Sequence, residues 1–119
     1  MNVLSRKAIL GANDLPSEKV NVPEWGGEVY VRSMNAMERE LYEQSIAIGE
    51  GDDRKLDFGH LRTRLLLFTV TDDQGKRLFE EGDVEALASK SARAINRIAE
   101  VAQRLNGIGV EALDAAKKP

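Results

Sequence analysis

The sequence contains no cysteine, which excludes disulfide bonds, thiolate nucleophiles and thiolate metal ligands together. Long apolar runs are missing as well. The longest, Leu65 to Val70, is interrupted by a threonine and falls far short of the roughly 20 residues that a membrane span requires. The N-terminus has no apolar signal region. We therefore expect a protein that stays in the cytoplasm where it is made and has no membrane partner.

A basic surplus is also absent, because 17 Lys and Arg residues face 20 Asp and Glu residues and leave a net charge of −3. Binding to nucleic acid requires excess positive charge on at least one face. The charge balance therefore predicts no nucleic-acid partner.

The composition that remains, 42% apolar and 31% charged residues in a chain of 119, is typical of one soluble domain with a single core. We expect this domain to span residues 1–109 and residues 110–119 to form a flexible C-terminal tail.

The N-terminal half shows alternating and then helical patterns. Ser5 to Leu10 can form one helical turn. Two alternating segments, Lys19 to Val22 and Glu28 to Arg32, are joined by Pro23–Gly27 and predict a β-hairpin over about residues 19–32.

The next helix has a clear start signal. Asn35, followed three residues later by Glu38, is an N-cap with a reciprocating glutamate, and it predicts a helix from Ala36 to Ile48. The apolar residues that recur at helical spacing along it are Met37, Leu41 and Ile48.

The middle of the chain predicts a loop and a buried helix. Gly49 to Asp57 is polar and glycine-containing, and Asp57 can cap a helix from Phe58 to Val70. Past Arg64 this helix is so apolar that it must be buried on most sides.

The C-terminal half predicts a turn and two helices. Thr71–Gly75 has turn chemistry, and Asp83 can cap a short helix that carries Val84 and Leu87. The last helix runs from about Ala92 to Leu105 and ends where Gly107 can adopt the left-handed conformation.

The expected fold class is mainly α (α+β): a compact helical domain with a small N-terminal β-hairpin. The side chains expected to dominate its core are Leu65, Leu66, Phe68, Ile95, Ile98 and Leu105.

Catalytic chemistry has little support. His60 is the only histidine, and it lies among charged residues at the polar start of a helix, as a solvated side chain would. No serine lies in a Gly-x-Ser-x-Gly elbow. The Val70 to Glu81 window resembles a calcium loop at some positions, but it lacks the first carboxylate. We expect no catalytic residue, no metal site and no cofactor.

Two surface features are candidate partner-binding sites. Arg93, Arg97 and Arg104, preceded by Lys90 and interrupted only by Glu100, form a basic stripe on the last helix. This stripe is either a solvated face in which Arg97 pairs with Glu100, or a docking strip for an acidic or amphipathic partner helix. Trp25, the only tryptophan, either covers the core or anchors a partner.

Three motifs occur in an order that resembles a known family. They are a Pro-x-Trp-Gly turn at residues 23–26, a Thr-Asp-Asp-x-Gly turn at residues 71–75, and an Ala-Gln-Arg-Leu-Asn-Gly helix end at residues 102–107. In these features the chain resembles the tail assembly chaperones of long, non-contractile-tailed bacteriophages.

The resemblance implies a function. Such chaperones bind the long, aggregation-prone tape-measure protein, keep it soluble, hand it to tail-tube subunits, and are absent from the finished virion. It therefore implies two partners, the tape-measure protein and the tail-tube protein, in the cytoplasm of the bacterial host. Self-association is a further expectation.

Members of the family are commonly also made as a longer form through a ribosomal frameshift near the 3′ end of the gene. The codons of Ala116-Lys117-Lys118 permit a slippery heptamer at that place.

Two other classes of function stay open. A small helical domain could be a structural head-tail or tail component retained in the virion. Asp83 to Ser91 followed by Ala92 to Leu105 also has the rhythm of a helix-turn-helix DNA-binding regulator, although the acidic balance opposes it.

Overall fold

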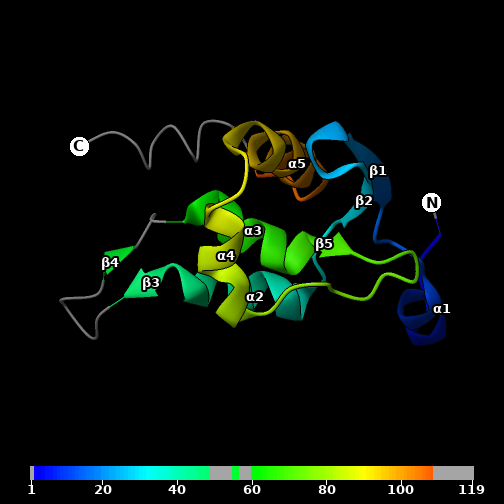
Figure 1. Ribbon diagram of the computed structural model, residues 1–119. Coiled ribbons are helices and arrows are strands. Elements are labelled where there is room, and N and C mark those ends of the chain that lie inside the picture. Colours follow the sequence, from blue (N-terminus) through cyan, green and yellow to red (C-terminus); the bar gives the residue numbers. More distant parts are fainter. Residues whose placement is uncertain (1, 49–54, 57–59, 109–119) are drawn as a thin grey trace.

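The computed structural model describes residues 2–48, 55–56 and 60–108 (Figure 1). Its helices are α1 (Arg6–Gly11), α2 (Ala36–Ser45), α3 (Leu61–Thr69), α4 (Val84–Ala88) and α5 (Ala92–Leu105), with short 3-10 turns η1 (Pro23–Trp25) and η3 (Glu81–Asp83). Its strands are β1 (Ser17–Val22), β2 (Gly27–Arg32), β3 (Ala47–Ile48), β4 (Lys55–Leu56) and β5 (Val70–Thr71). The mainly α fold with a small sheet near the N-terminus confirms the expected fold class.

The predicted hairpin is present. β1 pairs antiparallel with β2, with Val20 opposite Val29, and η1 joins them through Gly26 in the left-handed conformation at φ 77°. Alternation buries Val20 and Val22 on β1 and Val31 on β2, because one face of the hairpin packs on the core.

The helix predicted to end at Val70 ends at Thr69 instead. Val70 is extended, with φ −81° and ψ 125°, and β5 pairs antiparallel with β2 as the third strand of the sheet. Val31 and Val70 lie opposite each other and are both buried. This pairing across 39 positions of the sequence overrides the local helical pattern, because two β-branched residues fit a buried strand pair.

The helix predicted over Ala36 to Ile48 is shorter, and two of the apolar residues that recur along it are exposed. α2 begins at the predicted cap, where the side chain of Asn35 and that of Glu38 each accept from the other's backbone N–H. It ends at Ser45. Met37 and Leu41 are 70% and 44% exposed, whereas Tyr42 is buried and packs edge-on against Phe68 with ring centroids 6.1 Å apart.

A short strand pair connects the end of the predicted helix with the predicted loop: β3 lies in the segment predicted as helix, and β4 lies in the segment predicted as loop. β3 pairs antiparallel with β4, so Lys55 and Leu56 are not loop residues; residues 49–54 and 57–59 lie outside the described part. The predicted cap Asp57 is therefore also outside it. The N-cap position of α3 belongs to His60, which is exposed and left-handed at φ 59° and gives no side-chain cap.

The C-terminal helices follow the prediction with one correction. α5 spans the predicted Ala92–Leu105, and Gly107 is left-handed at φ 66°. The Asp83 side chain does not cap α4; it accepts from the backbone N–H of Glu80 at 2.7 Å, because a 3-10 turn precedes the helix.

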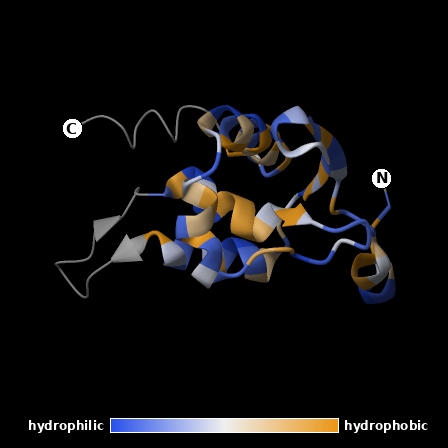
Figure 2. Cartoon of the chain, viewed as in Figure 1, coloured by the Kyte–Doolittle hydropathy of each residue, from blue (hydrophilic) through white to orange (hydrophobic). Residues whose placement is uncertain are grey.

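The core lies around α3, which packs against α5 on one side and α2 and α4 on the other (Figure 1). Five of the six predicted core side chains are buried, and Leu105 is only half-buried at the edge of the cluster. Figure 2 shows the apolar residues gathered on α3 and on the sides of its neighbours that face it. Among the described helices, none is long and apolar enough to cross a membrane.

Candidate partner-binding surfaces

The basic stripe on α5 does not stand free in solvent, because two of its arginines form ion pairs with the hairpin. Arg97 donates two parallel hydrogen bonds to Glu24, Nη1 to Oε1 at 2.7 Å and Nη2 to Oε2 at 2.9 Å. Arg104 donates to a carboxylate oxygen of Glu18 on β1. The partner of Arg97 is therefore Glu24, 73 residues away in the sequence, and not Glu100.

These pairs shift the acidity of the hairpin carboxylates. The hydrogen bonds from Arg97, followed by a backbone N–H, lower the pKa of Glu24 from 4.5 to about 2, and Arg93 adds a smaller electrostatic contribution. The hydrogen bond from Arg104 lowers the pKa of Glu18 in the same way. Both glutamates are thus anionic at neutral pH and hold the hairpin against α5.

Trp25 lies at the tip of the hairpin, in η1 and next to Glu24. Its side chain is 36% exposed, so part of the indole is covered and part meets solvent. Glu24 binds Arg97, and Trp25 is the next residue in the chain. We call Trp25, Arg93, Arg97 and Arg104 together the hairpin–α5 surface. Arg93 is exposed on the same helix, close enough to influence Glu24. Whether these residues bind a partner stays a prediction.

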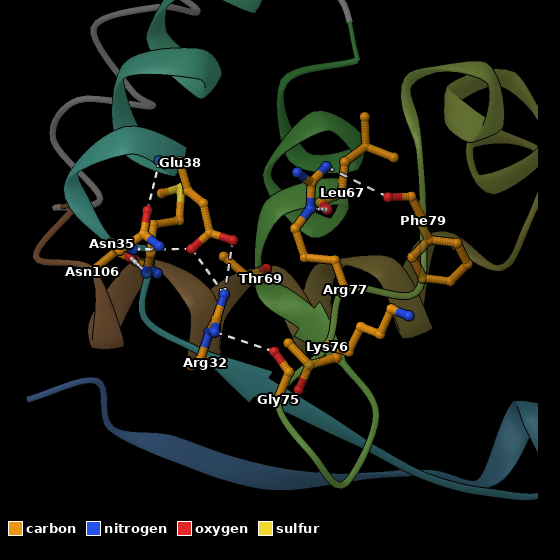
Figure 3. A network of polar contacts seen from close by, with 12 residues as sticks. Arg32, Asn35, Glu38, Leu67, Thr69, Gly75, Lys76, Arg77, Phe79 and Asn106 are labelled. Atoms are coloured by element: carbon orange, nitrogen blue, oxygen red, sulfur yellow. Dashed lines mark hydrogen bonds and ion pairs between the residues drawn. The ribbon is translucent and has the colours of Figure 1, made fainter. Parts of the chain in front are cut away.

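A polar network that the sequence did not reveal joins the strand, helix and turn elements (Figure 3). Arg32 of β2 contacts both carboxylate oxygens of Glu38 at 2.8 Å and donates to the carbonyl of Gly75 at 3.1 Å. Both side chains of the pair are largely shielded, with 17% and 12% exposure. The Asn35–Glu38 signal was visible in the sequence, but Arg32 carried none, because its contacts are tertiary.

The motifs that carry the family resemblance lie in this framework. Asp72 accepts the backbone N–H groups of Gln74 and Lys76 at 2.8 and 2.9 Å, and Gly75 is left-handed at φ 81°. Asn106 accepts from the backbone N–H of Met34 at 2.6 Å. The two motifs therefore stabilise the fold.

The Thr71–Gly75 turn does not connect two helices as the loop of a helix-loop-helix calcium site does. The Val70 to Glu81 window runs from a strand through a turn, and the described residues contain no group of three or more His, Cys, Asp or Glu that could hold a metal ion.

Exposed apolar side chains are the other feature of the surface. Met37 and Leu41 are exposed on α2, and four more lie in α1 or just before it: Val3, Leu4, Ile9 and Leu10. Single exposed apolar side chains are normal on protein surfaces, whereas contiguous patches of them mark contacts with other proteins.

Comparison with known proteins shows which family has this sequence and fold. None of the curated proteins matches the sequence. Among solved structures, the fold is similar to the tail assembly chaperone of bacteriophage HK97, with a TM-score of 0.56, 16% sequence identity, and coverage of 83% of this chain and 90% of that one. The sequence profile of a family described as phage tail assembly chaperone matches residues 6–118. Because that match covers nearly the whole chain, this protein belongs to the phage tail assembly chaperone family.

Proposed function

We propose that this chaperone binds the tape-measure protein of its phage, keeps it soluble, and recruits tail-tube subunits while the tail is assembled. The observation that carries the proposal is the family match over residues 6–118. The family is one of chaperones and not of enzymes.

The mechanism is reversible coating of amphipathic helical segments. A long helical client presents many similar segments, so several copies bind one client, each weakly enough to be displaced by tube subunits. Exposed apolar side chains and arginine forks are the groups suited to such segments, and both occur on this chain.

The hairpin–α5 surface is our candidate for the client contact. Trp25 offers a partly exposed aromatic ring, and Arg93 an exposed guanidinium for an acidic group on the client. Arg97 and Arg104 are already paired with Glu24 and Glu18, so they contact a client only at the edges of those pairs or by exchanging partners.

Co-expression with the tape-measure protein tests the function. The parent chaperone should convert that protein from insoluble to soluble and co-purify with it; a tape-measure protein that stays insoluble contradicts the proposal. Arg93→Glu should reduce co-purification, whereas Lys76→Glu, a charge reversal on an exposed turn residue outside this surface, should not.

A charge swap separates client binding from the internal pair. Arg97→Glu alone removes the Glu24 pair and any client contact together, while Arg97→Glu with Glu24→Arg restores an opposite-charge pair within the chain. If Arg97 contacts an acidic client, the swapped variant should remain defective although its circular dichroism is normal. Full recovery in the swapped variant assigns Arg97 to the fold alone.

We further propose that the protein works in the host cytoplasm and is absent from the mature virion. Mass spectrometry of purified particles should find no peptide of this chain. Its presence at a fixed copy number would favour the alternative of a structural tail component.

We also propose that a longer form of this protein is made through a ribosomal frameshift, because members of the family are commonly made in both forms. Residues Ala116-Lys117-Lys118 lie outside the described part, and their codons permit a slippery heptamer. Sequencing should show that heptamer there or within the preceding ten codons, with an overlapping −1 reading frame. A gene without either contradicts a frameshifted longer form.

The geometry does not support the alternative of a helix-turn-helix DNA-binding regulator. The residues that would read DNA lie near the start of α5, at Arg93, Asn96 and Arg97, and of these Arg97 is bound to the carboxylate of Glu24. Phosphate contacts need cations that are free of such partners.

A further inference from the structure

The two edges of the β1-β2-β5 sheet differ. The chain itself covers the edge at β5, where the Leu78 N–H donates to the carbonyl of Val70 at 3.2 Å. Beside it, the Asp72 N–H donates to the carbonyl of Lys76 at 2.8 Å. β1 is the other outer strand, and in Figure 1 it lies on the side away from α3. Within residues 2–48, 55–56 and 60–108, no segment returns along it.

The register of the hairpin shows which backbone groups of β1 point away from β2. The Ser33 N–H donates to the carbonyl of Pro16 at 3.0 Å, and antiparallel strands exchange such bonds at every second position. The even-numbered residues of β1 therefore bond to β2. The N–H and C=O groups that point to the outer side belong to Ser17, Lys19 and Asn21.

We call these three residues the open edge. All three are exposed, and their N–H and C=O groups make no backbone hydrogen bond to any described residue on the outer side. α5 lies on the opposite face of β1, where Arg104 binds Glu18. A row of backbone donors and acceptors of this kind is a template for an added strand.

Lys19 is at the centre of the open edge. Its Nζ lies 5.8 Å from the ring centroid of Tyr30, and it forms no ion pair in the part of the chain that the structure describes. The next outward position after the strand is Pro23, which has no N–H to offer. A charge at the centre and a proline at the end prevent indiscriminate pairing. They select a short segment with suitable charge.

An added strand places one side chain directly beside Lys19. Opposite charges in such a cross-strand position stabilise the pair, and like charges destabilise it. The other two residues of the open edge are neutral. Glu28 lies opposite Asn21 on β2, so a further strand spacing of about 4.8 Å separates it from an added strand. The charge of the open edge therefore favours an acidic side chain beside Lys19.

We propose that the open edge of β1 binds an extended segment of a partner protein, which adds to the sheet as a further strand and places an acidic residue beside Lys19. Backbone hydrogen bonds supply the binding, and the ion pair selects the segment. This contact uses backbone groups and differs in kind from the helical segments assigned to the hairpin–α5 surface. It is short, so binding should be weak and reversible.

A peptide probe tests the proposal. The probe is a capped heptapeptide in which threonine and valine alternate and a glutamate replaces the central valine; the control peptide has lysine at the centre. Amide signals of the isotope-labelled full chain are followed by nuclear magnetic resonance. The glutamate peptide should shift the signals of the open edge and slow its amide exchange. The lysine peptide should bind about fivefold more weakly.

Methylation of peptide nitrogens tests for strand pairing without changing the protein. N-methyl groups on both valines block one edge of the peptide, and N-methyl groups on the two central threonines block the other edge. One methylated peptide should bind as the parent peptide does, and the other should lose at least about tenfold in affinity. Equal binding of the two methylated peptides would overturn the proposal.

Variants of the protein locate the contact. Asn21→Pro removes one outward N–H and keeps the bonds to β2, so it should weaken binding, whereas Asn21→Thr should not. Lys19→Glu should reverse the preference, so that the lysine peptide binds better than the glutamate peptide. Circular dichroism checks that each variant folds.

Three results would contradict the assigned site. They are binding that neither Lys19→Glu nor Asn21→Pro alters, peptide-induced shifts confined to residues outside the hairpin, and slow exchange of the open-edge amides in the free chain. If that slow exchange disappears on dilution, a second copy covers the edge and the proposed partner is wrong.

Discussion

Ile98 is fully buried in the cluster that also contains Leu65 and Phe68. Removing its apolar side chain from water stabilises the fold by more than the side chain's lost conformational freedom costs. The same residue type at position 9 is more than half exposed. Ile98 and Ile9 therefore allow the same substitution to be compared at a core position and at a surface position.

We predict that Ile98→Ala lowers the free energy of unfolding by about 2 to 5 kcal/mol, because it leaves a cavity in a close-packed core. Ile9→Ala should change it by less than about 0.5 kcal/mol. Urea unfolding at low micromolar concentration, where self-association is weak, measures both. Equal effects of the two substitutions would contradict the assigned core.

Glu24 provides the second residue-scale prediction. Its pKa in the folded state is lowered from 4.5 to about 2, so the pair with Arg97 contributes stability above pH 4.5 and loses it as the pH falls through about 2. A nuclear magnetic resonance titration of the Glu24 carboxyl should have its midpoint near 2. In Arg97→Gln the midpoint should move towards 4.5; an unchanged midpoint would show that Arg97 is not the cause.

At the scale of elements, side chains that reach between them fix their arrangement. Arg32 connects β2 with α2 and with the turn at Gly75, while Asn106 connects the end of α5 with Met34 (Figure 3). Arg77 donates to the carbonyl of Leu67 at 2.7 Å and its guanidinium lies 4.4 Å from the ring centroid of Phe68. Each of these side chains joins segments that the backbone alone does not hold together.

We predict that Arg32→Ala destabilises the fold by about 1 to 3 kcal/mol, because it leaves the shielded Glu38 carboxylate without its main partner. Glu43→Ala is the control, since it removes only an exposed pair worth at most about 0.5 kcal/mol. Thermal and urea unfolding measure both. Adding Glu38→Gln to Arg32→Ala should recover part of the loss; a strictly additive double variant would argue against a coupled pair.

At the scale of the whole molecule, β5 joins the sheet directly to the central helix. α3 ends at Thr69, the next two residues pair with β2, and the hairpin is also held to α5 through Glu24 and Glu18. The hairpin therefore shares its core with the helices and is not an appendage.

We predict that the hairpin and the helices unfold in one transition. Trp25, the only tryptophan, reports on the hairpin by fluorescence, and far-ultraviolet circular dichroism reports on the helices. The two probes should give coincident midpoints, as two-state unfolding requires. A fluorescence midpoint at clearly lower urea concentration would mean that the hairpin opens independently.

Several features could be predicted from the sequence because their causes are local. The Asn35–Glu38 capping box, the left-handed Gly107 and the alternation along the hairpin depend on residues within a few positions of each other. The bounds of α5 and the burial of the second half of α3 follow from apolar periodicity. The sequence by itself therefore determined the fold class, most elements and most of the core.

Tertiary structure decided the rest, because periodicity shows which side chains are apolar and not what covers them. Met37 and Leu41 are spaced like core residues but remain exposed, since Tyr42 faces α3 instead. The pairing of Val70 with Val31 and the partners of Arg97, Arg104 and Arg32 depend on where distant segments return. Arg93 and Arg104 are exposed and Arg97 is half-buried, but only the path of the hairpin across α5 determined that two of these arginines are already paired.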